Sequence, residues 1–278
     1  MNAPPNSAGN ATTGLLLRLI GLVSAAVLAV GLQASELAKG LPGGNGYRLA
    51  DNDRSTQCGF AWLDLDRQGH ELELVAGHPG AAADDRAAML RLRRPFELFQ
   101  TRVDRLVVSG NGYLAAASDF AQDDGSDYGN RCGLPARADN ARSSLDRIFV
   151  YHDDLRPRPG ARVRHAFFED CPRAGVAGSE ACTVIEWDGF ERNAPLASSR
   201  PLRMQAVLYH RSHAIVMQYA SVDDSVGGQA TIGLQGLGGR SANRASCDVP
   251  GRVADGRALC FFDPRYPPDA APETATAP

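Results

Sequence analysis

Lysine is nearly missing from this sequence of 278 residues. Lys39 is the single lysine, so arginine supplies almost all of the 29 basic residues. This bias is typical of high-GC coding, and we therefore do not take the number of arginines as evidence for a polyanionic partner. The formal net charge is −3, and so mild a balance gives no reason to expect nucleic acid or an anionic membrane surface as a partner.

Motifs of common catalytic and metal sites are missing as well. The sequence has no G-x-S-x-G elbow, no HExxH and no CxxC, which removes the usual signatures of serine hydrolases, zinc peptidases and zinc-binding cysteine clusters. His210 and His213 form an HxxH pair, but zinc would need a further ligand, and the pair flanks a predicted hairpin tip. We expect no catalytic residue, while scattered serines, histidines and aspartates keep a secreted hydrolase open as an alternative.

One apolar run stands out near the amino terminus, Leu19–Leu32, with Arg18 directly before it. A positive charge, an apolar block of about 7–15 residues and a small-residue exit are typical of a secretory signal peptide, so residues 1–35 are predicted to form a signal helix. Counted from Leu15, the run has 18 residues, which is near the lower limit for spanning a bilayer. An uncleaved signal anchor is therefore the alternative. Either prediction makes the protein secreted, periplasmic or exposed at the cell surface.

Cysteine usage agrees with this compartment. An even number of cysteines in an exported chain indicates disulfides. Two stretches, FFEDCPRAGVAGSEACTVIEW and SCDVPGRVADGRALCFF, each place two cysteines at the ends of a loop between strand-like runs, where a bridge would close a hairpin. The expected pairs are Cys171–Cys182, Cys247–Cys260 and, by elimination, Cys58–Cys132.

The remaining chain is divided into many short β-rich runs bounded by Gly, Pro, Asn, Asp or Ser. About ten such runs, joined by short turns and without an amphipathic helix, indicate an all-β, antiparallel β-sandwich stapled by disulfides. CGFAWLDLD and HELELVA are expected to pair as its first hairpin. We assign residues 36–57 to a linker, 58–265 to the sandwich domain and 266–278 to a disordered tail.

Acidic residues are the only candidates for a cofactor site. Calcium takes six to eight oxygen ligands, and carboxylates on loops can supply them, but the spacing is not that of an EF-hand. A solvated loop or a side-chain cap of a turn explains the same residues. The candidates for calcium are Asp119, Asp123, Asp124, Asp127, Asp153 and Asp154. No other cofactor is expected.

Several segments occur in an order that resembles the nidogen-like β-sandwich modules of secreted bacterial proteins. They are CGFAWLDLDRQGHELEL, LRRPFELFQTRVDRLVVSGNGYLAAAS, LDRIFVYHDDL, CTVIEWDGF, LRMQAVLYHRSHAIVMQY and ATIGLQG. The resemblance runs from about Cys58 to Gly236, and the segment after it is predicted to add one strand pair. YHDDL and HRSH depart from the pattern of the family.

Four further residues have structural interpretations. In LVVSGNGYLAAAS, Asn111 and Gly112 tolerate positive φ and are predicted to form the tight turn of a hairpin. Trp62 and Trp187 lie in strand patterns and are expected to pack in the core, with a sugar-stacking platform as the alternative.

The resemblance implies an exported, non-catalytic module with a binding or structural role outside the cytoplasm. The partner would be an extracellular or envelope protein, or a glycan, and not nucleic acid. The membrane would be contacted only through the N-terminal segment if it is uncleaved. The alternative is a secreted hydrolase or an accessory domain of one.

Overall fold

The part of the fold that the structure describes is built from strands, with no helix. A computed structural model describes residues 46–130, 132–135, 143–173, 178–193, 200–223 and 230–268. These residues form fourteen strands, more than the ten expected, and none of them belongs to a helix that could cross a membrane. The predicted signal helix 1–35, the first part of the linker and most of the tail lie outside the described residues.

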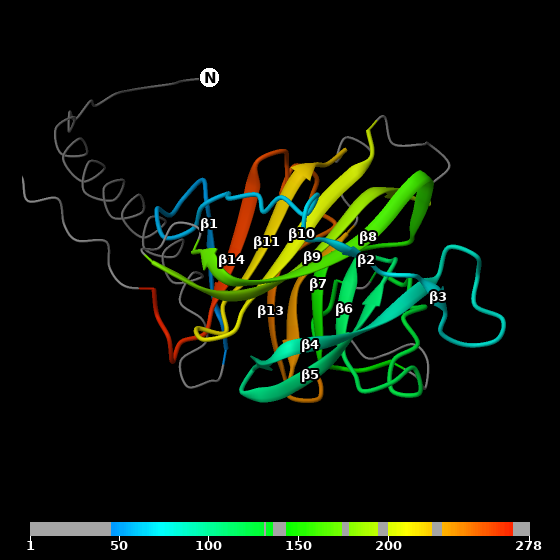
Figure 1. Cartoon of the computed structure of the whole chain (residues 1–278), viewed down its shortest axis with the longest axis horizontal. Helices are drawn as coiled ribbons and strands as arrows, with labels where there is room; N and C mark the ends of the chain where they lie inside the picture. Colours follow the sequence, from blue (N-terminus) through cyan, green and yellow to red (C-terminus); the bar gives the residue numbers. More distant parts are fainter. Residues whose placement is uncertain are drawn as a thin grey trace, which may run out of the picture. The chain divides into compact units, whose positions relative to one another are not determined.

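The strands form two seven-stranded antiparallel sheets packed against each other (Figure 1). Sheet A has the spatial order β1 (Arg48–Asp51), β14 (Arg257–Phe262), β11 (Ile215–Ser221), β10 (Leu202–Tyr209), β9 (Ser179–Arg192), β8 (Leu155–Pro172) and β2 (His70–Glu71). Sheet B has the order β13 (Ser241–Cys247), β12 (Thr231–Gly236), β7 (Arg147–His152), β6 (Tyr113–Ala116), β5 (Thr101–Ser109), β4 (Arg86–Leu98) and β3 (Val75–Ala76). The predicted antiparallel β-sandwich is confirmed.

The main core lies between the sheets, and two hydrogen bonds link the sheets across it. Trp187 of β9 is fully buried, and its indole N–H donates to the backbone oxygen of Ser109 at the end of β5 over 2.8 Å. The Tyr219 hydroxyl of β11 donates to the backbone oxygen of Val150 in β7 over 2.6 Å. Each bond satisfies a polar atom that burial would otherwise leave unpaired. The core position expected for Trp187 is confirmed.

Sheet A is buried on its outer face too, because residues 52–69 cross it. Gln205 of β10 accepts from the Leu63 N–H and donates to the Leu63 carbonyl, at 3.3 and 2.7 Å. Gln218 of β11 does the same for Ala61, at 2.6 and 2.9 Å. The side-chain amides thus take the place of a neighbouring strand. This corrects the expected first hairpin, since β2 contains only two residues and pairs with β8.

Two further expectations about this region are corrected. Trp62 is only partly buried; it stacks on Phe60 with ring centroids 6.1 Å apart and lies 5.1 Å from the Arg203 guanidinium. The predicted linker contains β1, which pairs with β14 and so forms the edge of sheet A.

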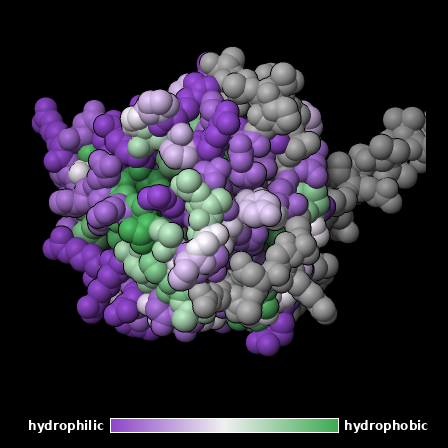
Figure 2. Space-filling model, turned by 90° about the vertical axis from the view of Figure 1, so that its right-hand side faces the viewer, coloured by the Kyte–Doolittle hydropathy of each residue, from purple (hydrophilic) through white to green (hydrophobic). Residues whose placement is uncertain are grey.

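The edge of sheet B at β3 and β4 is largely open. β3 pairs only with Arg86 and Ala87 of β4, so the rest of β4 has no strand on its outer side within the described residues. Figure 2 shows the side of the protein on which β3 lies in Figure 1; this face is mostly hydrophilic and has one apolar area. Val75 of β3 is 40% exposed.

The turn between β5 and β6 contains Asn111 and Gly112, as predicted. Gly112 has φ 75°, and a Cβ there would lie 2.1 Å from the Tyr151 carbonyl oxygen. Asn111 is not among the residues with positive φ, which corrects half of the prediction. Its buried side chain instead donates to Asp85 over 2.8 Å and accepts from the Leu155 N–H over 3.0 Å.

All six cysteines form disulfides, but two of the three expected pairs are wrong. The bonds are Cys171–Cys182, as expected from the β8–β9 hairpin, together with Cys58–Cys260 and Cys132–Cys247. The physical reason is that β13 and β14 do not pair with each other. β13 lies in sheet B and β14 in sheet A, so Cys247 and Cys260 are carried to different sheets.

The disulfides should differ in their contribution to stability. Cys58–Cys260 spans 202 residues and Cys171–Cys182 spans 11, and the loss of chain entropy on cross-linking grows with loop length. We expect the C58A/C260A variant to lose about 2.5 kcal/mol more of unfolding free energy than C171A/C182A, as measured by urea denaturation. Equal losses would show that loop length does not govern the effect.

Candidate functional site

A buried arginine anchors residues 119–127, the acidic loop, to the outer face of sheet B. Arg147 at the start of β7 is 3% exposed and forms ion pairs with Asp123 at 2.7 Å and Asp127 at 2.5 Å. Burial would raise the pKa of Asp127, but the nearby Arg147 outweighs it and holds the pKa of this carboxyl below its ordinary value. The contacts indicate a structural role, because both carboxylates already pair with an arginine of the chain itself.

Gly125 lies between these two aspartates and allows the loop to contact the sheet. It has φ 72°, and a Cβ there would lie 2.1 Å from the Cβ of Ala87 in β4. The Ser109 hydroxyl donates to the Gly125 carbonyl over 2.6 Å. The loop therefore seals one part of the outer face and leaves the neighbouring part uncovered.

The six aspartates proposed for calcium do not converge on one point, although Asp123 and Asp127 meet at Arg147. Asp119 accepts from the N–H groups of its own loop, Asp124 accepts from Ser126, Asp153 pairs with Arg192, and Asp154 accepts from Asn193. In the described part of the chain, the one group of three potential ligands within 4.8 Å of one another is Cys132, Cys247 and Asp248, and its two sulfurs form a disulfide. This geometry gives no support to the calcium hypothesis.

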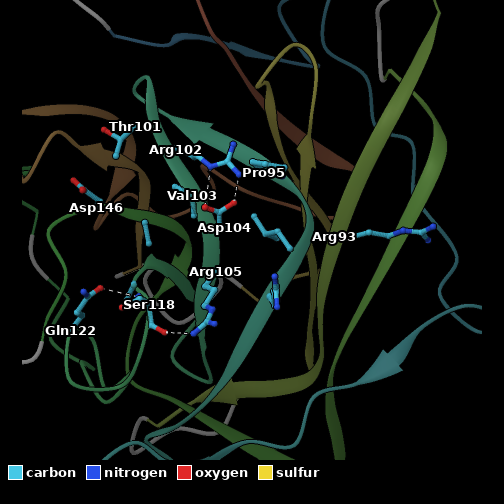
Figure 3. A pocket seen from close by; sticks show the side chains of 14 residues that line it. Arg93, Pro95, Thr101, Arg102, Val103, Asp104, Arg105, Ser118, Gln122 and Asp146 are labelled. Atoms are coloured by element: carbon cyan, nitrogen blue, oxygen red, sulfur yellow. Dashed lines mark hydrogen bonds and ion pairs between the residues drawn. The ribbon is translucent and has the colours of Figure 1, made fainter.

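The uncovered part of sheet B forms an open groove of about 880 Å³ (Figure 3). β4 and β5 form its floor, and the segment after β6 forms a wall through Ser118 and Gln122. Gln122 accepts from the Ser118 N–H over 2.8 Å, which keeps this wall in place. The charged side chains that line the groove are Arg91, Arg93, Arg102, Arg105, Asp104 and Asp146.

Two arginines of the groove stand directly opposite each other. Arg91 of β4 is the cross-strand partner of Arg105 of β5, so their Cα atoms are about 5 Å apart. Both side chains are exposed, and like charges at opposed positions destabilise a sheet. Arg105 donates to the Ser118 carbonyl over 3.2 Å; no carboxylate pairs with either arginine among the described residues. An anion between the two guanidinium groups would relieve their repulsion.

The other charges of the groove are arranged differently. Arg102 and Asp104 form a bidentate pair at 3.0 and 2.9 Å. Arg93 extends away from the other labelled side chains in Figure 3 and lies 4.9 Å from the ring of Phe167 in β8. The centre of the groove therefore has an excess of positive charge, although the chain as a whole is negative.

These arginines were not among the expected site residues, because the abundance of arginine was attributed to coding bias. One available signal was the alternation in LRLRR, residues 90–94, which predicts that Arg91 and Arg93 lie on a solvent-facing side of a strand. The pairing of Arg91 with Arg105 depends on the register of β4 against β5. This register is shifted by an irregularity between Arg91 and Phe96.

Comparison with known proteins identifies the family. Residues 70–251, more than half of the chain, match the family described as NIDO related. The chain belongs to this family. No curated protein and no solved structure matches it. Membership of the NIDO-related family favours a non-enzymatic module, and the nidogen-like resemblance is confirmed.

The groove and the acidic loop both lie within the NIDO-related region, whereas β1, β14 and the disulfide Cys58–Cys260 lie outside it. The segment after the sequence resemblance is therefore not the added strand pair that we expected. Its β13 belongs to the family region and extends sheet B, and β14 extends sheet A.

The histidine pair of the NIDO-related domain links the two sheets. His210 contacts the Thr183 hydroxyl at 2.8 Å and the Pro95 carbonyl oxygen at 3.0 Å through its two ring nitrogens. His213 accepts from the Glu97 N–H over 3.3 Å. These contacts account for the HRSH sequence without a metal ion.

Buried histidines should make stability depend on pH. Burial lowers the pKa values of His152, His165, His210 and His213. Below the ordinary pKa of about 6.5, the unfolded chain binds protons that the native state excludes. Unfolding free energy therefore falls as the pH decreases through that value.

We expect the free energy of unfolding to fall between pH 7.5 and 5.5. His152 is 2% exposed and alone would contribute up to about 1.4 kcal/mol to this fall. Urea denaturation of wild type and H152Q at both pH values measures it: the variant should lose less stability on acidification. The same pH dependence in both proteins would contradict the expectation.

Proposed function

We propose that this protein is a non-catalytic binding module that works outside the cytoplasm and binds an anionic ligand in the groove on sheet B. The opposed, exposed pair Arg91 and Arg105 is the observation that carries the proposal. Guanidinium groups present planar donor pairs that match carboxylate, sulfate and phosphate oxygens. Two like charges on side chains whose Cα atoms are about 5 Å apart cost stability in the free protein, and binding of an anion recovers it.

The proposed location rests on the disulfides and the family. Three disulfides are typical of an oxidising compartment, and the NIDO-related family is consistent with an extracellular site. The signal helix expected in residues 1–35 would direct the chain there. Secretion, a periplasmic location or display at the cell surface all agree with these observations.

Replacement of both arginines should weaken anion binding without weakening the fold. We expect R91Q/R105Q to bind a heparin tetrasaccharide at least tenfold more weakly than wild type, since each charge-assisted hydrogen bond contributes about 1.5–3 kcal/mol. Isothermal titration calorimetry at low salt measures the affinity. The unliganded variant should be equally stable or more stable by about 0.2–1 kcal/mol, because the repulsion is removed.

R54Q is the matched control, since Arg54 is 79% exposed and precedes the NIDO-related region. It should keep its affinity within about twofold, as expected for a distant surface charge. Equal affinities of R91Q/R105Q and R54Q, or no binding by the wild type, would reject the proposed groove.

A further inference from the structure

A second basic cleft adjoins the groove. It has a volume of about 470 Å³ and lies between the turn before β2 and the middle of β4. Its lining includes Arg67, His70, Arg93 and Phe167. Arg93 also lines the groove on sheet B, so the two clefts meet at this side chain.

The edge of β4 between the two clefts is free. β3 ends its pairing at Ala87, and no described strand lies beside Arg91, Arg93 or Arg94 on the outer side of β4. A long ligand can therefore pass from one cleft to the other without displacing a strand.

Positive charge continues across this edge. Arg93 and Arg94 lie 4.9 and 5.6 Å from the Phe167 ring, and both approach Glu169, at 3.6 and 2.5 Å. Glu169 is 56% exposed, and such exposed pairs exchange readily for another anion because they are worth little. Arg67 is exposed at the turn, and His70 faces His165 with ring centroids 5.7 Å apart.

The side chains that line both clefts are better suited to bind a polymer rich in oxygen atoms than to bind the surface of a protein. Protein partners are held chiefly by aromatic and aliphatic anchors in dry pockets. The large hydrophobic side chains that are exposed in the described residues are Phe60, Val75, Tyr128, Val249 and Tyr266, and none of them lines either cleft. Phe167 does line the second cleft, but the Arg93 and Arg94 guanidinium groups lie over its ring. The groove offers Ser118, Gln122 and Asp104 beside its arginines. Ser118 and Gln122 can bond hydroxyl groups as well as anions, and the Asp104 carboxylate can accept from hydroxyl groups.

From this arrangement we propose that the ligand is an acidic polysaccharide, sulfated or rich in uronic acids. Its chain runs from the groove over the edge of β4 into the second cleft. The proposal rests on the function proposed above and deepens it. Arg91 and Arg105 bind one stretch of the chain, and Arg67 and His70 bind a stretch several sugars away.

Chain length separates this proposal from simple anion binding in the groove. We would titrate the wild type with heparin fragments from disaccharide to decasaccharide, at neutral pH and several salt concentrations. Affinity should increase at least tenfold from tetrasaccharide to decasaccharide, because a second contact on the same chain profits from a high effective concentration. R67Q/H70Q should lose this gain, keep the tetrasaccharide affinity, and reduce the slope of log K against log salt by about one for the lost arginine.

Each outcome of this experiment has a separate meaning. The extended path is overturned if affinity does not depend on the length of the heparin fragment, or if R67Q/H70Q keeps the gain. The proposed groove still stands in that case if R91Q/R105Q binds the tetrasaccharide more weakly than the wild type. If neither R91Q/R105Q nor R67Q/H70Q binds more weakly than the wild type, both proposals are rejected. Poly-glutamate or single-stranded DNA of equal charge is the competing arm: tighter binding of either than of heparin and polygalacturonate would overturn the polysaccharide class. R54Q should behave as wild type throughout.

Discussion

The buried Arg147 guanidinium holds the acidic loop against the outer face of sheet B through Asp123 and Asp127. A buried ion pair of this kind contributes little net stability, since desolvation offsets most of the attraction, but loss of one partner is costly. Its effect here is positional. The loop covers one half of the face, and the wall at Ser118 and Gln122 marks where the cover ends and the groove begins.

The outer face of sheet A is also covered, but by a different interaction. Gln205 and Gln218 bind the backbone of Ala61 and Leu63, so an extended segment covers the sheet without adding a strand. The disulfide Cys58–Cys260 ties this segment to β14. Both partners lie outside the NIDO-related region, so the terminal segments complete one sheet while the family region contains the groove.

Charge is distributed unevenly over this protein. The chain is slightly acidic, yet Arg91 and Arg105 face each other on one sheet, and Arg67, Arg93 and Arg94 follow at its open edge. Among the described residues, more acidic than basic side chains are buried, Asp123 and Glu186 among them. Overall composition therefore describes neither the groove nor the edge, because burial removes more negative than positive charge from the surface of the described residues.

The sequence by itself determined the all-β class, the use of all cysteines in disulfides and the β8–β9 hairpin with Cys171–Cys182, because alternation and turn residues act over a few positions. Only the tertiary structure decided that Cys58 meets Cys260 and that Arg91 meets Arg105. Those contacts depend on which sheet receives a strand and on a register shifted by a bulge. Neither property follows from spacing along the chain. The first is set by the packing of segments far apart in sequence, and the second by the place at which the β4–β5 hairpin is bulged.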